Sequence, residues 1–358
     1  MRILLTGAAG FVGGAVGEAG AAAGHEMVLV DALIPQAHPV DATAAANVHR
    51  LDVRDAADGA TWAELLRGVD VVCHQAAMVG AGVTSADMPL YAGHNDLGTA
   101  ALLAGMSAAG VRRLVLASSM VVYGEGRYRC PDHDLQRPAA RAVADLEAGR
   151  FECPCPTCGR DLEWALVPED ADLDPRSSYA ASKLAQEHFA RAWARQAGGS
   201  VIALRYHNVY GPHMPQDTPY SGVAAIFRSQ VEAGTAPQVF EDGGQMRDFV
   251  HVSDVAAANL LAVEAVAADA PGDVRAFNVC SGTPVSIADV AGLVARGTGA
   301  DLSPVVTGGY RPGDVRHVVA SPERAAAELG FRAAVRPDAG LVEFASAPLR
   351  QTRPVTSR

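Results

Sequence analysis

A tyrosine and a lysine four positions apart, in Tyr179-Ala-Ala-Ser-Lys183, have the residue types and the spacing that suit proton transfer. On a helix, residues i and i+4 share one face, so the lysine ammonium would lie beside the phenol. A neighbouring positive charge favours the phenolate and lowers the tyrosine pKa from its usual value of about 10. Such a tyrosine can act as a general base near neutral pH. The spacing is common by chance, so the pair is informative only beside other features.

A second candidate is the hydroxyl pair Ser118-Ser119, which ends an apolar run predicted to be a strand. In open α/β sheets, ligands bind outside the carboxyl ends of the strands. A serine there can hydrogen-bond a substrate hydroxyl and relay its proton to a tyrosine. The alternative role is a serine that caps local backbone.

A glycine-rich turn, Gly7-Ala-Ala-Gly10-Phe-Val-Gly13, follows the first predicted strand and opens a helix. Glycines in this place allow the backbone to approach a pyrophosphate, which sits at the positive helix N-terminus. Asp31 closes the second strand, where a carboxylate accepts hydrogen bonds from an adenosine ribose and repels a 2′-phosphate. NAD is therefore favoured over NADP. Asp52-Val53 follows a third strand and is placed to meet the adenine, although a plain loop carboxylate is an equal alternative for Asp52.

The elements that must position these residues are short apolar runs alternating with alanine-rich stretches through the first 205 residues. Continuous apolar runs are typical of strands buried on both faces. Their alternation with helices predicts an α/β fold with a doubly wound parallel sheet. The predicted strands are 3–5, 27–30, 69–73, 114–118 and 201–204, and the predicted helices are 12–23, 98–109 and 179–196.

Composition limits the remaining classes. The 358 residues are 49% hydrophobic and carry a formal net charge of −11, which excludes global disorder and argues against nucleic-acid binding. No run approaches the roughly 18 apolar residues of a membrane helix, and no signal peptide is visible. We therefore expect a cytoplasmic protein without a membrane or nucleic-acid partner.

Four of the six cysteines lie between positions 130 and 158, within a segment that lacks the strand-helix alternation. Cys130-Pro-Asp-His133 and Cys155-Pro-Thr-Cys158-Gly159 match a zinc knuckle with tetrahedral nitrogen and sulfur ligands. We expect Cys130, His133, Cys155 and Cys158 to be the ligands of a structural zinc ion, with Cys153 as the substitute for His133. Free thiols in a solvated loop are the alternative. Zinc would pin this loop close to the mouth of the active site.

Further motifs extend the pattern along the chain: His74-Gln-Ala-Ala77, Arg205-Tyr-His-Asn208-Val-Tyr-Gly-Pro212, a segment from Gln245 to Asp254, and Arg311-Pro-Gly-Asp314. Together with the motifs above, they make the sequence resemble the extended short-chain dehydrogenase/reductase family, in its nucleotide-sugar epimerase/dehydratase branch. The resemblance runs from residue 3 to about 340, except for the insertion. It implies a Rossmann NAD-binding domain over 1–205, interrupted by the insertion at 127–172. A smaller, partly interleaved substrate-binding region follows over 206–345, and a flexible tail over 346–358.

The resemblance also implies roles. Tyr179 would be the catalytic base, Lys183 its electrostatic partner, and Ser119 the hydroxyl that positions the sugar 4-OH. A homodimer through helices 98–109 and 179–196 is expected. The implied diphosphate ligands are Asn208, Arg247 and Arg311, and the implied NAD ligands are Gly7, Gly10, Phe11, Val12, Gly13, Asp31, Asp52, Val53, Ala76, Tyr179 and Lys183.

The residues after Ser119 bear on the reaction. Dehydratases of this branch place Asp-Glu there and decarboxylases keep a Glu at the second position, whereas this chain has Met120-Val121. Neither can move a proton, which favours a 4-epimerase of a nucleoside-diphosphate sugar. A 4,6-dehydratase or decarboxylase with an acid from elsewhere is the alternative, and a non-catalytic nucleotide-sensing protein is a weaker one. UDP-glucose/galactose, UDP-glucuronate/galacturonate and TDP-sugars stay open, although the absence of arginine after Pro212 mildly disfavours a uronic acid.

Overall fold

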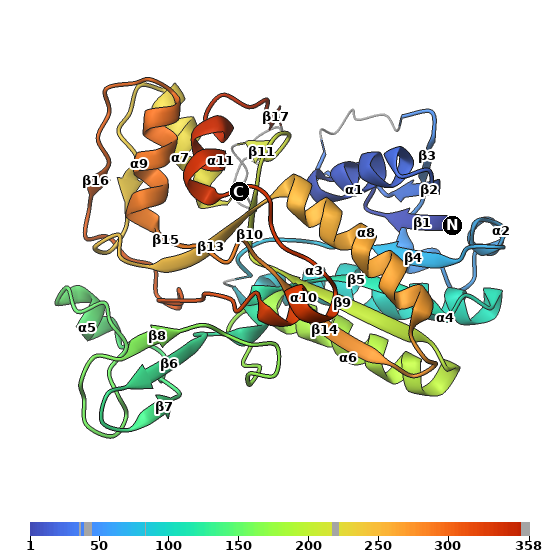
Figure 1. Cartoon of the computed structure of the whole chain (residues 1–358), viewed down its shortest axis with the longest axis horizontal. Coiled ribbons are helices and arrows are strands. Elements are labelled where there is room, and N and C mark those ends of the chain that lie inside the picture. The colour runs from blue at the N-terminus through green and yellow to red at the C-terminus, as the bar shows by residue number, and fades with distance from the viewer. Residues whose placement is uncertain (36, 39–44, 83, 217–221, 352–358) are drawn as a thin grey trace.

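A seven-stranded sheet, parallel throughout, forms the centre of the computed structural model, which describes residues 1–35, 37–38, 45–82, 84–216 and 222–351 (Figure 1). The doubly wound α/β fold predicted from the alternating pattern is confirmed. In sheet order, the strands are β14 (Val274–Val279), β9 (Ser200–Tyr206), β5 (Arg113–Ser119), β4 (Val71–His74), β1 (Arg2–Thr6), β2 (Glu26–Asp31) and β3 (Val48–Arg50).

Helices cover both faces of this sheet. Because side chains alternate along a strand, Leu4 packs into the core of one face while Ile3 and Leu5 pack into the core of the other. The first core is closed by α2 (Ala60–Leu66), α4 (Gly98–Ala109) and α6 (Ser178–Ala197). The second is closed by α1 (Phe11–Ala22), α8 (Val252–Ala268) and α10 (Glu323–Glu328). Short helical segments complete the lobe around the central sheet: η1 (Val53–Asp55), η2 (Ser85–Asp87), α3 (Met88–Tyr91), η3 (Ala92–Leu97) and η4 (Met120–Tyr123).

A second lobe lies beyond the carboxyl ends of the central strands and surrounds its own apolar core (Figure 1). Three of its strands form one sheet, in the order β10 (Asn208–Tyr210), β13 (Met246–His251) and β15 (Pro284–Ser286). Its helices are α7 (Val223–Glu232), α9 (Ile287–Gly297) and α11 (Pro337–Phe344), and β12 (Gln238–Val239) pairs with β16 (Val305–Val306). The chain returns to the first lobe through α8, β14 and α10, so the two lobes are interleaved in sequence.

The cysteine-rich insertion forms a small separate unit beside the second lobe (Figure 1). Its antiparallel sheet has the order β7 (Asp134–Gln136), β6 (Arg127–Cys130), β8 (Glu163–Ala165), and one short helix, α5 (Val143–Glu147), precedes the second pair of cysteines.

The segment predicted to be a flexible tail is ordered in its first part, which corrects that prediction for residues 346–351. Arg350–Gln351 forms β17 and pairs in parallel with β11 (Pro215–Gln216). The Arg350 guanidinium also donates to the carbonyl of Ala9 at 2.6 Å. Backbone hydrogen bonds and one half-buried arginine hold this segment, and neither produces a hydrophobic period in the sequence. The remainder of the predicted tail, residues 352–358, lies outside the described residues.

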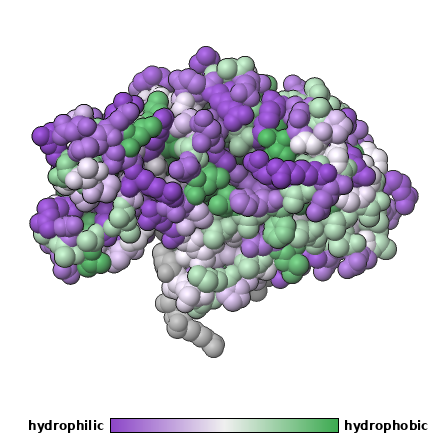
Figure 2. Space-filling model, turned by 90° about the horizontal axis from the view of Figure 1, so that it is seen from below, coloured by the Kyte–Doolittle hydropathy of each residue, from purple (hydrophilic) through white to green (hydrophobic). Residues whose placement is uncertain are grey.

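Among the helices of the described residues, none has the length and apolar composition that crossing a bilayer requires. On the face seen in Figure 2, hydrophobic side chains form scattered patches between hydrophilic ones rather than one broad apolar surface.

Candidate functional site

The glycine-rich turn connects β1 to α1 with very little free space. Gly7 has a φ of +69°, and a Cβ on it would lie 2.7 Å from the backbone nitrogen of Ala76. A Cβ on Gly13 would lie 1.9 Å from the carbonyl oxygen of Gly7. Gly10 is the N-cap of α1 and offers no capping side chain, so the first-turn N–H groups, which include those of Phe11 and Val12, have no acceptor within the helix. This is the arrangement that binds a pyrophosphate.

A cavity of about 100 Å³ beside this turn collects most of the residues expected to hold the adenosine of NAD. The Asp31 carboxylate accepts hydrogen bonds from the backbone N–H of Ala9, at 3.0 Å, and of Leu33, at 2.8 Å. Burial raises the pKa of Asp31, but these bonds and His38 outweigh it and hold the pKa below its usual range, so the group is charged. The predicted residues that line the cavity are Gly7, Gly10, Asp31, Asp52, Val53 and Ala76.

Two of the predicted NAD contacts have other neighbours in this structure. Asp52 caps η1 and forms an ion pair with Arg54 at 2.6 Å, so its carboxylate is already partnered. The Phe11 side chain packs against the core of the second lobe and lines a different cavity. For Phe11, only the backbone is directed to the pyrophosphate position.

Tyr179, Lys183 and Ser119 come together where β5 ends and α6 begins. Tyr179 lies in the first turn of α6, which Ser177 caps by accepting a hydrogen bond from Ala180 N–H at 3.1 Å. Ser119 is the last residue of β5, and its hydroxyl is hydrogen-bonded to Tyr179. Lys183 donates to the carbonyl oxygen of Ala117 at 3.0 Å. The three side chains predicted to carry the chemistry therefore meet at one sheet edge.

The electrostatics of this group differ from the simple expectation that Lys183 lowers the tyrosine pKa. Burial raises the pKa of Tyr179 to about 12, and the hydrogen bond with Ser119 offsets only part of that effect. Burial also lowers the pKa of Lys183 to about 8. Removal from water disfavours both charged forms, and the Lys183 ammonium is directed at a backbone carbonyl.

A cavity of about 290 Å³ adjoins Tyr179 and is formed by small and apolar residues for much of its wall. A Cβ on Gly82 would lie 2.5 Å from the backbone nitrogen of Tyr179, so this loop approaches α6 closely. The lining residues are Gly80, Ala81, Gly82, Met120, Val121, Gly124, Arg176, Ser177, Tyr179, Ala180, Pro312, Gly313, Asp314, Val315 and Val318.

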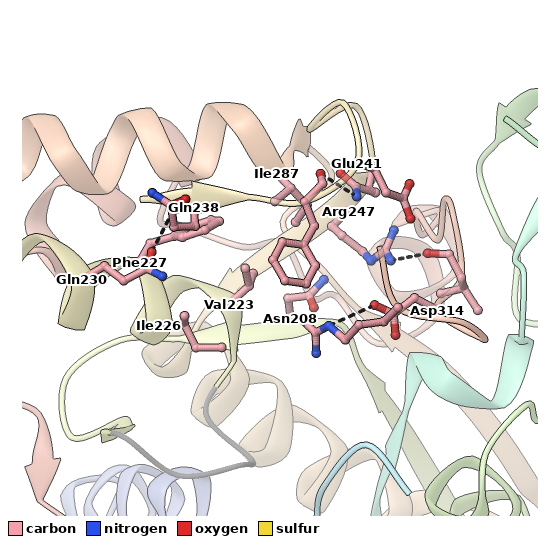
Figure 3. Close-up of a pocket in the computed structure, with 14 residues that line it drawn as sticks. Asn208, Val223, Ile226, Phe227, Gln230, Gln238, Glu241, Arg247, Ile287 and Asp314 are labelled. Atoms are coloured by element: carbon pink, nitrogen blue, oxygen red, sulfur yellow. Dashed lines mark hydrogen bonds and ion pairs between the residues drawn. The ribbon is translucent and has the colours of Figure 1, made fainter. Parts of the chain in front are cut away.

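A larger cavity of about 420 Å³ shares Asp314 and Val315 with it and brings together Asn208, Arg247 and Arg311 (Figure 3). Arg247 donates to the carbonyl oxygens of Met246, Val315 and Arg316 at 2.7 to 2.9 Å, which fixes its guanidinium in place.

The other two predicted substrate ligands are held from different sides of this cavity. Arg311 lies over the ring of Phe240, 5.3 Å from its centroid. Asn208 donates to the Asp248 carbonyl at 3.1 Å. All three predicted substrate residues thus line one cavity.

Several residues of these cavities escaped the sequence analysis. Gln230, Gln238 and Phe240 line the larger cavity from α7 and β12, and Arg176 lines the smaller one. They belong to no motif, and only the packing of the second lobe onto the first brings them to the site. The amphipathic segment 223–232 was the one local signal that could have pointed to a wall of this cavity.

The insertion carries a separate cluster. The ligand atoms of Cys130, His133, Cys155 and Cys158 all lie within 4.8 Å of one another. Within the described residues, the group includes His133 and leaves out Cys153. The four predicted metal ligands therefore lie together.

Comparisons with known proteins agree with this architecture. Residues 3–141 and 159–280 match the NAD dependent epimerase/dehydratase family. The chain is 35% identical over 341 residues to a dTDP-L-rhamnose 4-epimerase of Burkholderia thailandensis, covering 92% of this chain and 90% of that one. A UDP-glucose 4-epimerase of Thermus thermophilus, solved with NAD, superposes with a TM-score of 0.72 at 29% identity, covering 96% and 98% of the two chains. MoeE5, solved with UDP-glucuronic acid and NAD, gives the same TM-score, identity and two coverages. Because the family match spans most of the chain, the protein belongs to the NAD-dependent epimerase/dehydratase family.

Proposed function

We propose that the protein is an NAD-dependent 4-epimerase of a nucleoside-diphosphate sugar. The observation that carries this proposal is the composition of the smaller cavity: it adjoins the hydrogen-bonded Ser119–Tyr179 pair, yet Met120 and Val121 line it where an elimination would need an acid and a base. The 4-epimerases among its relatives support the same reading.

In this proposal, Tyr179 takes the proton of the sugar 4-OH while Ser119 hydrogen-bonds the same oxygen. NAD held at the glycine turn would supply the hydride acceptor for oxidation at C4 and the hydride donor for its reversal, so no external reductant would be consumed. Lys183, which donates to the Ala117 carbonyl in the chain alone, would hold the nicotinamide ribose. Arg247 and Arg311 would supply the positive charge that faces the diphosphate, with Arg247 held by its hydrogen bonds to backbone carbonyls and Arg311 exchanging its 3.6 Å pairing with Asp314 for phosphate oxygens. The sugar alone then turns, and Tyr179 returns the proton after hydride has reached the opposite face.

The smaller cavity, which adjoins Tyr179 and would hold the sugar, has walls that favour a neutral sugar over a uronic acid. A sugar carboxylate needs an unengaged cation, and the arginine in this cavity, Arg176, is in an ion pair with Asp174 at 2.7 Å. The small residues Gly80, Ala81 and Gly82 and the apolar Met120 and Val121 suit a hydroxymethyl or methyl group at C5. At the other end, Val223, Ile226 and Phe227 offer apolar surface to a base while Gln230 and Gln238 offer amides.

Product analysis tests the proposal. The purified protein is incubated separately with UDP-glucose, dTDP-L-rhamnose, TDP-glucose and UDP-glucuronate, and the products are identified by NMR and mass spectrometry. We expect a product of unchanged mass, inverted at C4 and formed without added NADH. A product lighter by water or carbon dioxide would instead identify a dehydratase or decarboxylase.

Tyr179→Phe identifies the base in the same assay. The variant should lose at least about 10²-fold in kcat, the usual contribution of a general base, and still bind NAD. Tyr91→Phe is the matched control, because the Tyr91 ring lies 5.8 Å from that of Tyr179 and we assign it no role in proton transfer. Full activity of Tyr179→Phe would exclude Tyr179 as the base.

The homodimer through α4 and α6 stays a prediction. Leu97, directly before α4, and Phe189, on α6, are exposed apolar side chains on these helices, which is the surface such a dimer would cover. Light scattering after size-exclusion chromatography measures the mass directly.

A further inference from the structure

We propose that Cys130, His133, Cys155 and Cys158 bind one structural zinc ion. We propose further that this ion holds the insertion against the wall of the larger cavity, of about 420 Å³, which we call the nucleotide cavity because the proposed function places the nucleoside diphosphate there. The metal site stands on the geometry of the insertion alone. Its effect on substrate binding rests additionally on the proposed function.

The spacing of the four side chains matches a tetrahedral ion. Zinc–sulfur bonds of about 2.3 Å and zinc–nitrogen bonds of about 2.0–2.1 Å set two sulfurs about 3.8 Å apart and a sulfur and a nitrogen about 3.5 Å apart. Cys130 Sγ lies 3.7 Å from Cys158 Sγ and 3.4 Å from His133 Nδ1, and Cys155 Sγ lies 3.9 Å from the same nitrogen. The sulfur–sulfur distance is far beyond the roughly 2.05 Å of a disulfide bond. These separations leave room for one ion at the centre.

The backbone presents the ligands twice in the same way. Cys130-Pro131-Asp132-His133 and Cys155-Pro156-Thr157-Cys158 both have a proline directly after the first ligand. In each, the residue after the second ligand has a positive φ: +56° at Asp134 and +75° at Gly159. The turns close with hydrogen bonds from His133 N–H to the Cys130 carbonyl, at 3.3 Å, and from Gly159 N–H to the Cys155 carbonyl, at 2.8 Å. Two similar turns thus bring the four ligand atoms within 4.8 Å of one another, which is the arrangement expected of a metal site.

The remaining cysteine of the insertion has a different environment. Cys153 is fully buried beside Tyr128, to which it is hydrogen-bonded. It lies outside the group of four residues whose ligand atoms are within 4.8 Å of one another. Its thiol is thus part of the small core of the insertion rather than of the proposed metal site.

The insertion needs such a support because its apolar core is minimal. The buried cluster consists of Tyr128, Cys130, Cys153, Cys155 and Leu162, so two of its five members are themselves proposed ligands. Units with so small a core usually depend on a metal or disulfides. Four protein ligands leave no open coordination position, so the ion is structural rather than catalytic.

The metal site connects directly to the nucleotide cavity through Glu152, which lies three residues before Cys155. The Glu152 carboxylate accepts a hydrogen bond from Arg316 Nε at 2.9 Å and contacts His317 Nε2 at 2.9 Å. The buried Arg316 also donates to Glu241 at 2.9 Å and to Asp242 at 2.8 Å.

A second arginine makes the same connection from the insertion itself. Arg141 donates to both carboxylate oxygens of Glu241, at 2.8 and 2.9 Å, and to the carbonyl of Asp314 at 2.7 Å. Glu241 and Asp314 both line the nucleotide cavity. Displacement of the insertion would therefore loosen this wall, whereas none of these contacts involves the glycine turn at residues 7–13.

Metal analysis of the full chain tests the site. The protein is purified with reductant, depleted of metal, reconstituted with Zn²⁺ alone and measured by plasma mass spectrometry. We expect one zinc per chain, lost in Cys158→Ser and in His133→Gln and kept in Cys153→Ser, the matched control from the same loop. Co²⁺ substitution should give thiolate charge-transfer absorption that weakens in Cys158→Ser. The site is refuted if the reconstituted protein holds no zinc, or if Cys153→Ser loses zinc while Cys158→Ser keeps it.

Calorimetric titration with UDP, TDP and NAD tests the link to the cavity without requiring turnover. Cys158→Ser should weaken binding of the preferred nucleoside diphosphate by about tenfold or more, the effect of losing a charged hydrogen-bonded contact, and leave NAD affinity unchanged. Glu152→Gln should weaken the same binding while keeping its zinc. Unchanged nucleotide affinity in the zinc-free variant would refute the proposal that the ion supports the wall of the nucleotide cavity. A product other than an epimer would overturn the proposed function, and the zinc content would still stand as measured.

Discussion

Glu187 and Arg205 form a buried ion pair that fixes α6 on the central sheet. Glu187 lies one turn after Lys183 on α6, and Arg205 lies on β9; they are 6% and 3% exposed. Both carboxylate oxygens accept from Arg205, at 2.8 and 3.0 Å, and one also accepts from Ser118 Oγ, directly before Ser119. A double-mutant cycle of Glu187→Gln and Arg205→Met measures how strongly the two charges are coupled.

Removing one partner of a buried pair leaves the other charge uncompensated, at a cost of about 3–5 kcal/mol in the free energy of unfolding. For Glu187→Gln we expect the lower end, about 3 kcal/mol, because Arg205 keeps hydrogen bonds to Tyr123 Oη and to the carbonyl of Glu169, both at 2.9 Å. For Arg205→Met the upper end applies, since the carboxylate retains a single hydroxyl donor. The double variant buries neither charge, so its cost should fall short of the sum of the single costs by at least about 2 kcal/mol.

Urea denaturation followed by tryptophan fluorescence provides the four free energies, and the buried Trp193 reports from α6 itself. Single-variant costs below about 1 kcal/mol, or costs that add within about 0.5 kcal/mol, would refute the description of this pair as a coupled buried charge. Glu187→Gln should also lower kcat, because the pair sets the position of Tyr179 and Lys183 relative to β5.

Two further predictions concern the cofactor site. Asp31→Asn should weaken NAD binding by at least about tenfold and reduce the preference for NAD over NADP. The single oxygen of an amide cannot accept hydrogen bonds from both Ala9 and Leu33 N–H and also from the ribose hydroxyls. Calorimetric titration with both cofactors measures the two affinities. Lys183→Met should abolish most activity, yet its urea midpoint at about pH 7 should be no lower than that of the wild type. Burial lowers the Lys183 pKa from 10.5 to about 8, so burying the lysine costs free energy of folding at that pH. The folded chain then binds fewer protons than the unfolded chain between these values, so wild-type stability gains from Lys183 as pH rises from about 8 to about 10.5; the same rise in the variant would contradict the assignment.

The features that sequence predicts well are those that a few adjacent residues encode. The glycine turn requires Gly7 and Gly13 because any Cβ would collide with backbone, so its signature is local. Tyr179 and Lys183 share a helix face, and α4 spans the predicted residues 98–109. Continuous apolar runs identify buried strands for the same reason, since every position of β9 is buried.

The features that sequence predicts poorly depend on segments that meet only in the folded chain. Gln238 and Phe240 acquire a role because β12 pairs with β16, more than sixty residues later. The ordered β17 depends on pairing with β11. The direction of the Tyr179 pKa shift is a further case, because it follows from how deeply α6 and β5 bury the phenol rather than from its spacing to Lys183.

The raised pKa of Tyr179 bears on when this residue could act as a base. In the chain alone, burial favours the neutral phenol of Tyr179 and works against the charged form of Lys183, so the site does not hold a ready-made base near neutral pH. A positive charge close to Tyr179, where the proposed function places the nicotinamide, would oppose the effect of burial on the phenol, because it stabilises a phenolate in surroundings of low dielectric more strongly than it would in water. Oxidised NAD carries such a charge on its nicotinamide ring and loses it on reduction. Under the proposed function, the oxidised cofactor would therefore make Tyr179 a stronger base, and loss of that charge would favour the protonated phenol.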